Sequence, residues 1–168
     1  MKDIKLNLRI IYSAIIISVF CFQLHAQDSP SGEESAAIAS SYNLTLQHTT
    51  LVVSNFEASR EFYTKILGLK DLNADWLPEN QMFISLGNNL ELHVGEVPGV
   101  EIKPSTFNHF AISTNDLDAY LKHLNSHGVI HSSLGGGEKK YIQKRPDGVS
   151  QTFIQDPDGY WIEINDAN

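Results

Sequence analysis

The strongest constraint on this chain is an internal repeat. Two segments begin alike about 61 residues apart: each opens with a histidine, His48 or His109, runs through a short β-rich stretch and continues as a helical pattern. Both halves also close alike, with a glycine four residues before a glutamate, Glu91 or Glu163, that stands between two aliphatic residues. Such a repeat marks two similar structural units. Because units of about sixty residues bury too little surface to fold comfortably alone, the halves are expected to share one core.

Each half has the pattern of a strand, a helix and further strands. Apolar residues fall roughly on one face of the helical stretches 56–68 and 117–128. The side chains that could cap these helices are Ser54 or Asn55 for the first and Thr114 or Asn115 for the second. Another apolar run and a turn precede each closing glutamate. The sequence therefore predicts an α+β domain over residues 45–168, with modules at about 45–98 and 105–166.

Two histidines and two glutamates occupy corresponding places in the two halves. His48 and His109 each open a strand, and strand alternation turns Glu91 and Glu163 away from their aliphatic neighbours. If the halves pack about a pseudo-twofold axis, all four side chains can converge on one point. Imidazole and carboxylate together suit one divalent ion such as Ni, Zn, Co, Mn or Fe. Each residue alone has an ordinary alternative, since strand histidines are usually surface or core residues and such glutamates usually face solvent.

The remaining histidines are weaker candidates. His93 shares the strand face of Glu91, so it could be a substitute ligand, a residue that supports a ligand or, more simply, part of a cavity wall. His123, His127 and His131 lie on and just past the second predicted helix. They are interpreted as solvent-facing and turn residues.

The N-terminus has the layout of a secretory signal peptide. A small positive excess in residues 1–9 is followed by the apolar run Ile10–Phe22 and by the small residue Ala26, so residues 1–26 are predicted to be removed. The run is short for a membrane span, which needs about 20 residues; an uncleaved anchor is the alternative. The mature protein is expected to be secreted or periplasmic, without a stable membrane anchor. Residues 27–44, rich in Ser, Ala and Glu, are predicted to be a flexible leader.

Composition argues against two classes of function. The chain has 20 acidic and 12 basic residues and a formal net charge of −8, so nucleic acid is not an expected partner. Cys21 is the only cysteine, and it is predicted to leave with the signal peptide. Cleavage would therefore leave no disulfide and no thiolate chemistry in the mature domain.

Several motifs resemble the vicinal oxygen chelate superfamily, the glyoxalase/bleomycin-resistance/dioxygenase group. They are His48-Thr-Thr-Leu-Val-Val, Phe62-Tyr63 before Leu67-Gly68-Leu69, Asn108-His109-Phe-Ala-Ile, and Asp156-Pro-Asp-Gly-Tyr-Trp-Ile-Glu163. The resemblance covers about residues 45–166. It implies two βαβββ modules that form an incomplete barrel around a metal site.

The resemblance also implies a ligand set and a reaction. The expected metal ligands are His48, Glu91, His109 and Glu163, a set similar to that of bacterial glyoxalase I (lactoylglutathione lyase). The metal would polarise the substrate oxygens and stabilise an enediolate while a proton moves next to a carbonyl. Glu163 would be the main base, released from the metal by the substrate, and Glu91 could share that work. No separate organic cofactor is implied.

The chain departs from the glyoxalase pattern in two places. Val52 stands where glyoxalase I typically has an arginine for the glutathione carboxylate, and Gly95 stands where it has an asparagine. Both departures weaken the case for glutathione and leave the ligand set intact. The basic cluster of Lys139, Lys140, Lys144 and Arg145 follows three glycines, so it is either a cationic lid over an anionic substrate or, more simply, a solvated loop.

The first functional prediction is a metal-dependent, glyoxalase I-like lyase or isomerase. Its substrate is a small molecule, such as the hemithioacetal of methylglyoxal and glutathione. One alternative is a metal-dependent ring-cleaving dioxygenase, although Glu91 would fill a coordination position that such an enzyme leaves open. The other is a small-molecule binding protein without catalysis, such as an antibiotic-resistance protein. A homodimer is expected because members of the family often pair modules across chains.

Overall fold

The structure is a computed structural model that describes residues 32–167. The predicted signal peptide, residues 1–26, lies outside the described residues and stays a prediction. The chain divides into two compact units, with the boundary after Leu44. Among residues 32–167, no helix is long and apolar enough to cross a membrane.

The described part of the first unit contains one helix, α1 (Gly32–Ser41). The sequence predicts a flexible leader over residues 27–44, whereas the structure has this helix within it. The alanines and glutamates of the segment are good helix formers, which accounts for a helix that lacks a strong apolar pattern.

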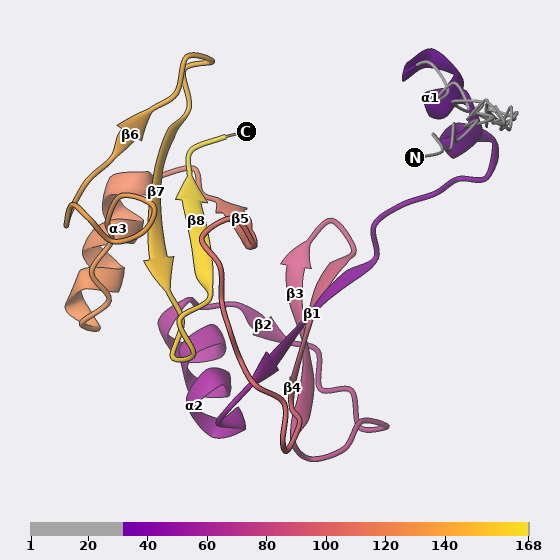
Figure 1. Cartoon of the computed structure of the whole chain (residues 1–168), viewed down its shortest axis with the longest axis horizontal. Helices are drawn as coiled ribbons and strands as arrows, with labels where there is room; N and C mark the ends of the chain where they lie inside the picture. The colour runs from indigo at the N-terminus through magenta and orange to yellow at the C-terminus, as the bar shows by residue number, and fades with distance from the viewer. Residues whose placement is uncertain (1–31, 168) are drawn as a thin grey trace, which may run out of the picture. The chain divides into compact units, whose positions relative to one another are not determined.

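The second unit consists of two modules with the same order of elements (Figure 1). The first module contains β1 (His48–Val53), α2 (Phe56–Glu61), η1 (Phe62–Ile66), β2 (Lys70–Asp71), β3 (Gln81–Gly87) and β4 (Leu90–Glu96). The second contains β5 (His109–Ser113), α3 (Leu117–Ser126), β6 (Gln143–Lys144), β7 (Ser150–Gln155) and β8 (Trp161–Asn165). The sheets have the matching orders β1-β4-β3-β2 and β5-β8-β7-β6.

This arrangement confirms the predicted α+β fold of two βαβββ modules. In each sheet the first and last strands of the module pair in parallel, and the remaining neighbours are antiparallel. Both sheets are open, and each has four strands. The repeat seen in the sequence is therefore a repeat of topology.

Local capping explains where the helices of the second unit begin. The side chain of Asn55 accepts a hydrogen bond from the Ala58 N–H at 3.0 Å, as predicted. The second prediction, Thr114 or Asn115, is wrong, because Asp116 caps α3 by accepting from the Ala119 N–H at 2.9 Å. Aspartate is as good a cap as asparagine, and Asp116 lies directly before the first helical residue.

One hydrophobic core joins both modules. It includes the buried side chains Phe62, Tyr63, Leu67, Ile84, Leu92, Leu121, Leu124, Ile154, Ile162 and Ile164. The Tyr120 hydroxyl on α3 donates to the Leu67 carbonyl at 2.9 Å, and the His123 ring nitrogen Nε2 contacts the Ile66 carbonyl at 2.8 Å. The helix-bearing faces of the two sheets thus share one interior, and alternation along the strands turns their opposite faces away from it.

The turn between β7 and β8 clasps the first module. The Tyr63 hydroxyl donates to Asp156 Oδ2 at 2.7 Å, and both residues are buried. The Asp158 carboxylate accepts from the Ser54 N–H at 3.1 and 3.2 Å, and the Tyr160 hydroxyl donates to the Val52 carbonyl at 2.9 Å. Burial raises the pKa of the Tyr63 hydroxyl well above its usual value, so Tyr63 remains a donor. We name these contacts the Tyr63–Asp156 clasp.

We expect Tyr63→Phe to lower the free energy of unfolding by about 1.5–3 kcal/mol, because a buried carboxylate loses a donor. Tyr160→Phe is the matched control. It removes a hydroxyl that bonds a neutral carbonyl, and its expected cost is about 1 kcal/mol or less. Denaturant unfolding of both variants measures the difference. Equal losses would contradict the central place given to Tyr63 in the clasp.

His131 differs from its sequence interpretation. It is predicted to lie in an exposed turn, whereas the structure leaves only 5% of it exposed, at the start of the segment that leads into β6. Its ring Nδ1 is buried and has no hydrogen-bond partner among the described residues. Burial, followed by the nearby charge of Lys140, lowers the pKa of His131.

The lowered pKa predicts a pH dependence of stability. The unfolded chain takes up a proton at His131 below about pH 6.5, whereas the folded chain resists it, so stability falls as the pH drops below that value. We expect His131→Gln to reduce the slope of unfolding free energy against pH between pH 7.5 and 5.5. An unaltered slope in His131→Gln would show that His131 does not titrate in this way.

Candidate functional site

The first candidate pair lies on the first sheet, where β1 and β4 begin. His48 on β1 is directly opposite Glu91 on β4. Their strand neighbours Val53, Leu92 and Val94 are buried in the core, so alternation places both side chains on the opposite face. Gln47 links them: its Nε2 donates to Glu91 Oε2 at 2.7 Å, and its Oε1 accepts from His48 Nδ1. Because Nδ1 is the donor in that contact, neutral His48 presents a free Nε2 lone pair.

The second candidate pair lies on the corresponding face of the second sheet. His109 Nδ1 donates to the Thr106 carbonyl at 3.0 Å, and His109 Nε2 is 3.6 Å from Glu163 Oε2. Glu163 is only 7% exposed. Its other oxygen, Oε1, accepts from Asn165 Nδ2 at 2.7 Å and lies 3.9 Å from Arg145 Nη1. A buried carboxylate is thus held by an amide and a guanidinium on one oxygen.

The two pairs do not occupy equivalent register positions. His48 faces Glu91 across its sheet, but His109 faces Trp161, and Glu163 faces Ala111. The sequence predicts matched positions for the two glutamates, and the register shows that they differ by two residues. The β-bulge between Ser85 and Gly87 in the first module is one irregularity that equal residue counts cannot reveal.

In register terms, His93 takes the place in the first sheet that Glu163 takes in the second, since His93 lies opposite Thr50. Its ring centroid is 6.3 Å from that of His48, and its Nε2 bonds Gln81 Oε1 at 2.9 Å. Burial, followed by the nearby His48, lowers the pKa of His93. His93 therefore lies beside His48, and its predicted part in a cavity wall stays a prediction.

Gly95 provides the space for this contact. It lies opposite Gln81 in the sheet, and a Cβ atom at Gly95 would stand 3.2 Å from Gln81 Cγ. The departure from the glyoxalase pattern at this position therefore accommodates a side chain that holds His93. Val52, the other departure, lies on the same strand face as His48, so β1 brings no cation to the first pair.

The four predicted ligands remain two separate pairs. Within residues 32–167 of one chain, no group of three or more His, Cys, Asp or Glu side chains is arranged to hold a metal ion. His48 and Glu91 belong to one sheet, and His109 and Glu163 belong to the other. The expected convergence of the four side chains therefore does not occur within a single chain.

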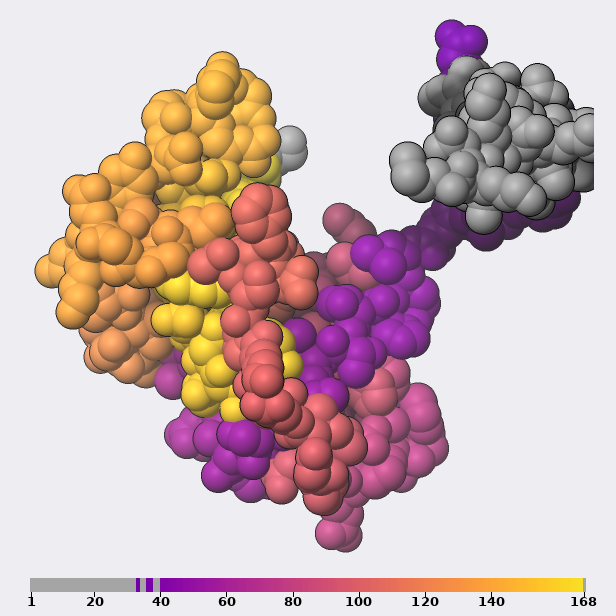
Figure 2. Space-filling view, in the orientation of Figure 1, coloured from indigo at the N-terminus to yellow at the C-terminus, as the bar shows by residue number. Residues whose placement is uncertain are grey.

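A depression of about 560 Å³ adjoins the first pair. Its lining consists of Gln47, His48, Leu72, Asn73, Ala74, Asp75, Trp76, Phe83 and Glu91. The corresponding face of the second sheet, which carries His109 and Glu163, is more buried. Phe153 and Trp161 on that face are only 3% and 7% exposed. Between the modules runs the connecting segment 97–108, visible across the front of the second unit in Figure 2, and it carries the exposed Phe107.

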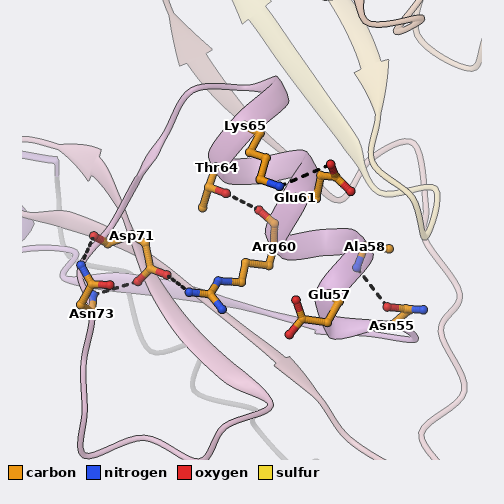
Figure 3. Close-up of a pocket in the computed structure, with 9 residues that line it drawn as sticks. All are labelled: Asn55, Glu57, Ala58, Arg60, Glu61, Thr64, Lys65, Asp71 and Asn73. Carbon is orange, nitrogen blue, oxygen red and sulfur yellow. Dashed lines mark hydrogen bonds and ion pairs between the residues drawn. The ribbon is translucent and has the colours of Figure 1, made fainter.

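A second groove, also about 560 Å³, follows the outer side of α2 (Figure 3). Four of its charged groups are paired: Arg60 lies 3.5 Å from Asp71, and Lys65 lies 3.6 Å from Glu61. Asp71 also accepts from the Asn73 N–H at 2.8 Å. None of the predicted ligands lines this groove, so it does not compete as the functional site.

Sequence reasoning did not identify the two amides that hold the glutamates. Gln47 directly precedes His48, and Asn165 lies two residues after Glu163 on the same strand face, so proximity was the available signal. Of the predicted basic cluster, Arg145 reaches Glu163 and also pairs with Asp147. Lys139 and Lys140 are exposed, in line with the simpler interpretation of a solvated loop.

Comparison by sequence gives several relatives that are named lactoylglutathione lyases, together with one uncharacterized protein, YaeR of Escherichia coli. The chain is 28% identical over 130 residues to the lactoylglutathione lyase GLX1 of Arabidopsis thaliana, covering 73% of this chain and 44% of that protein. It is 28% identical over 132 residues to the lactoylglutathione lyase of Salmonella typhimurium, covering 74% of this chain and 93% of that protein. The chain thus spans less than half of the plant protein and nearly all of the bacterial one.

Solved structures with this fold include a lactoylglutathione lyase from Agrobacterium tumefaciens and proteins of other kinds. The oxidase ChaP-H2 has a TM-score of 0.61 at 23% identity, covering 74% of this chain and 94% of that chain. TnmS3, an antibiotic-binding protein from Streptomyces sp. CB03234, has a TM-score of 0.57 at 22% identity, covering 74% of this chain and 97% of that chain. These two similarities establish the fold alone.

The match to a known family covers both modules and all four predicted ligands. The family described as Glyoxalase/Bleomycin resistance protein/Dioxygenase superfamily matches residues 45–164. That range contains both His–Glu pairs and the Tyr63–Asp156 clasp. The chain belongs to the glyoxalase/bleomycin resistance protein/dioxygenase superfamily.

Proposed function

We propose that the protein is a metal-dependent lyase or isomerase that moves a proton next to a carbonyl group, with a site formed between two copies of the chain. The observation that carries this proposal is that each sheet holds one His–Glu pair, fixed by hydrogen bonds, on the face that points away from the shared core. In each pair the histidine offers Nε2 and the glutamate is steadied by an amide. The first pair of one copy and the second pair of its partner together make the ligand set.

The donor chemistry fits a divalent ion. Two neutral imidazoles and two carboxylates supply four donors of the kinds that Zn, Ni, Co, Mn and Fe accept. Nδ1 of each histidine is already engaged, by Gln47 or by the Thr106 carbonyl, which fixes the tautomer that a ligand needs. A divalent ion held there would polarise the substrate oxygens and acidify the neighbouring C–H bond.

Glu163 is the proposed base. Asn165 and Arg145 both approach its Oε1, so Oε2 is the oxygen left to take up a proton. Glu91 presents the opposite arrangement, because Gln47 holds its Oε2 and leaves Oε1 available. Two carboxylates on opposite sides of a bound substrate would allow a proton to leave one carbon and return to its neighbour.

A binding protein without catalysis is the second candidate. The specific observation in its favour is the exposed indole of Trp76 in the depression beside His48, together with the fold shared with an antibiotic-binding protein. Metal binding separates the two candidates, since a purely aromatic binding site has no need for the four ligands. Secretion after removal of residues 1–26 stays part of the proposal.

The two-copy site predicts complementation between inactive variants. His48→Ala destroys the first pair and His109→Ala destroys the second, so neither homodimer has a complete ligand set. A mixed dimer has one site with both defects and one site with neither. Random pairing of the two variants, co-expressed with different tags, should restore about a quarter of the wild-type metal content.

Metal content is measured by elemental analysis on the mixed sample. The matched control is the double variant His48→Ala/His109→Ala co-expressed with His48→Ala. Neither of these chains has an intact first pair, so no dimer of them has a complete ligand set. Metal restored in this control as well would contradict a site shared between copies. Wild-type protein that holds no metal after reconstitution would overturn the catalytic proposal.

Gln47 is predicted to strengthen metal binding without touching the metal. We expect Gln47→Leu to weaken metal affinity by about 10–100-fold, because His48 and Glu91 both lose the group that orients them. Gln81→Leu is the matched control, since Gln81 contacts His93 and neither ligand. Isothermal titration with Zn²⁺ measures both. If Gln81→Leu weakens binding more than Gln47→Leu, then His93 rather than Glu91 is the ligand of the first sheet.

A further inference from the structure

An aromatic surface leads from solvent to the first candidate pair. The ring centroids of Trp76 and Phe83 are 5.8 Å apart, and that of Phe83 is 5.7 Å from His48 and 4.4 Å from His93, on which it stacks. Trp76, His48 and Phe83 all line the same depression, which Glu91 borders as well. A ring placed on this surface would therefore lie next to the proposed ligands.

Trp76 is exposed although its loop is held in place. The indole is 73% exposed, a large apolar surface to leave in water. The loop that carries it is fixed by backbone hydrogen bonds, from the Leu72 N–H to the Phe83 carbonyl at 2.9 Å and from the Leu77 N–H to the Ala74 carbonyl at 3.0 Å. An exposed ring on a fixed loop is arranged to bind before any ligand arrives.

The negative charge of the depression favours uncharged or cationic ligands over anionic ones. Within one chain its lining includes two carboxylates, Asp75 and Glu91, and no lysine or arginine. Arg145, which the second pair of another copy would bring, is already paired with Asp147 and Glu163. Val52 likewise brings no cation to the face that carries His48. A tripeptide thiol with two carboxylates would meet negative charge in this depression, whereas an uncharged or cationic ring would meet an aromatic wall with an acidic rim.

We propose that the depression binds the aromatic ring of the substrate, and that the substrate is an uncharged or cationic aromatic compound with vicinal oxygens rather than a glutathione adduct. This inference rests on the proposed function for the placement of the vicinal oxygens at the metal ligands. Trp76 is the specificity-determining residue, because it supplies the open face against which the ring stacks. Asp75 disfavours an anionic ring.

The test uses two unreactive probes that differ only in the ring. Mandelamide carries a phenyl group beside vicinal hydroxyl and carbonyl oxygens, and lactamide carries a methyl group in its place. Binding of each to the full chain is followed by NMR titration, with Zn²⁺ and without it. We expect mandelamide to bind about tenfold more tightly than lactamide, a ratio in keeping with an aromatic contact plus burial of the ring.

Trp76→Ala should bring the affinity for mandelamide to within about twofold of that for lactamide, while the affinity for lactamide stays unchanged. Phe107→Ala is the matched control, because Phe107 is an equally prominent exposed aromatic outside the depression. The inference is overturned if Trp76→Ala leaves the ratio intact, if Phe107→Ala abolishes it equally, or if Trp76→Ala acts by converting a dimer into monomers in light scattering.

A charged probe tests the second half of the inference. Mandelamide with a carboxylate at the para position of the ring should bind at least threefold more weakly than mandelamide, and Asp75→Asn should narrow that gap. Equal or tighter binding of the carboxylated ring would remove the claim about charge.

The two sets of measurements fail separately. Zinc binding without a preference for mandelamide would overturn this inference and leave the proposed function standing. A preference that depends on Trp76 without zinc binding would support the ring site and overturn the proposed function.

Discussion

The Tyr63–Asp156 clasp is the contact on which the arrangement of the candidate site depends. It fixes the turn between β7 and β8 of the second module against the helix of the first, where both partners are buried. Once the modules are joined on their helix-bearing sides, the opposite faces of both sheets must turn outward. His48 and Glu91 therefore form one pair and His109 and Glu163 another within the described residues, and the proposed site completes the ligand set with a second copy.

Features that depend on short stretches of sequence could be predicted. The strand, helix and further strands of each module follow from apolar periodicity and from the repeat, whereas the βαβββ arrangement follows from the family resemblance. The cap at Asn55 follows from its place before the first helix. The separation of the two His–Glu pairs could not be predicted, because it depends on which faces of the modules meet. Likewise, the burial of His131 depends on its tertiary surroundings, and a residue five positions past the end of α3 gives no sign of that.

The outward faces combine exposure with local order. His48 and His109 are exposed, yet hydrogen bonds from neighbouring groups fix the ring nitrogens that do not face a carboxylate. Gln47 holds one oxygen of Glu91, and Asn165 and Arg145 hold one oxygen of Glu163. This costs less than burying an unpaired charge and leaves the other oxygen of each carboxylate available. This combination of exposure and fixed geometry suits the proposed site, because each chain would hold its own His–Glu pair in place before two chains associate.

The Asp156–Gly159 turn limits what membership of this superfamily reveals about the reaction of a chain. Its residues mark the resemblance clearly, yet in this structure they bind Ser54 and Tyr63 of the other module rather than any proposed ligand. The turn connects the two modules, and the proposed ligands lie on sheet faces that the turn does not cover. A chain can therefore keep this motif unchanged while the loop around Trp76 or the residues of β4 acquire a different ligand. Similarity at the turn indicates how the modules are assembled, and reaction type has to be judged from the faces they expose.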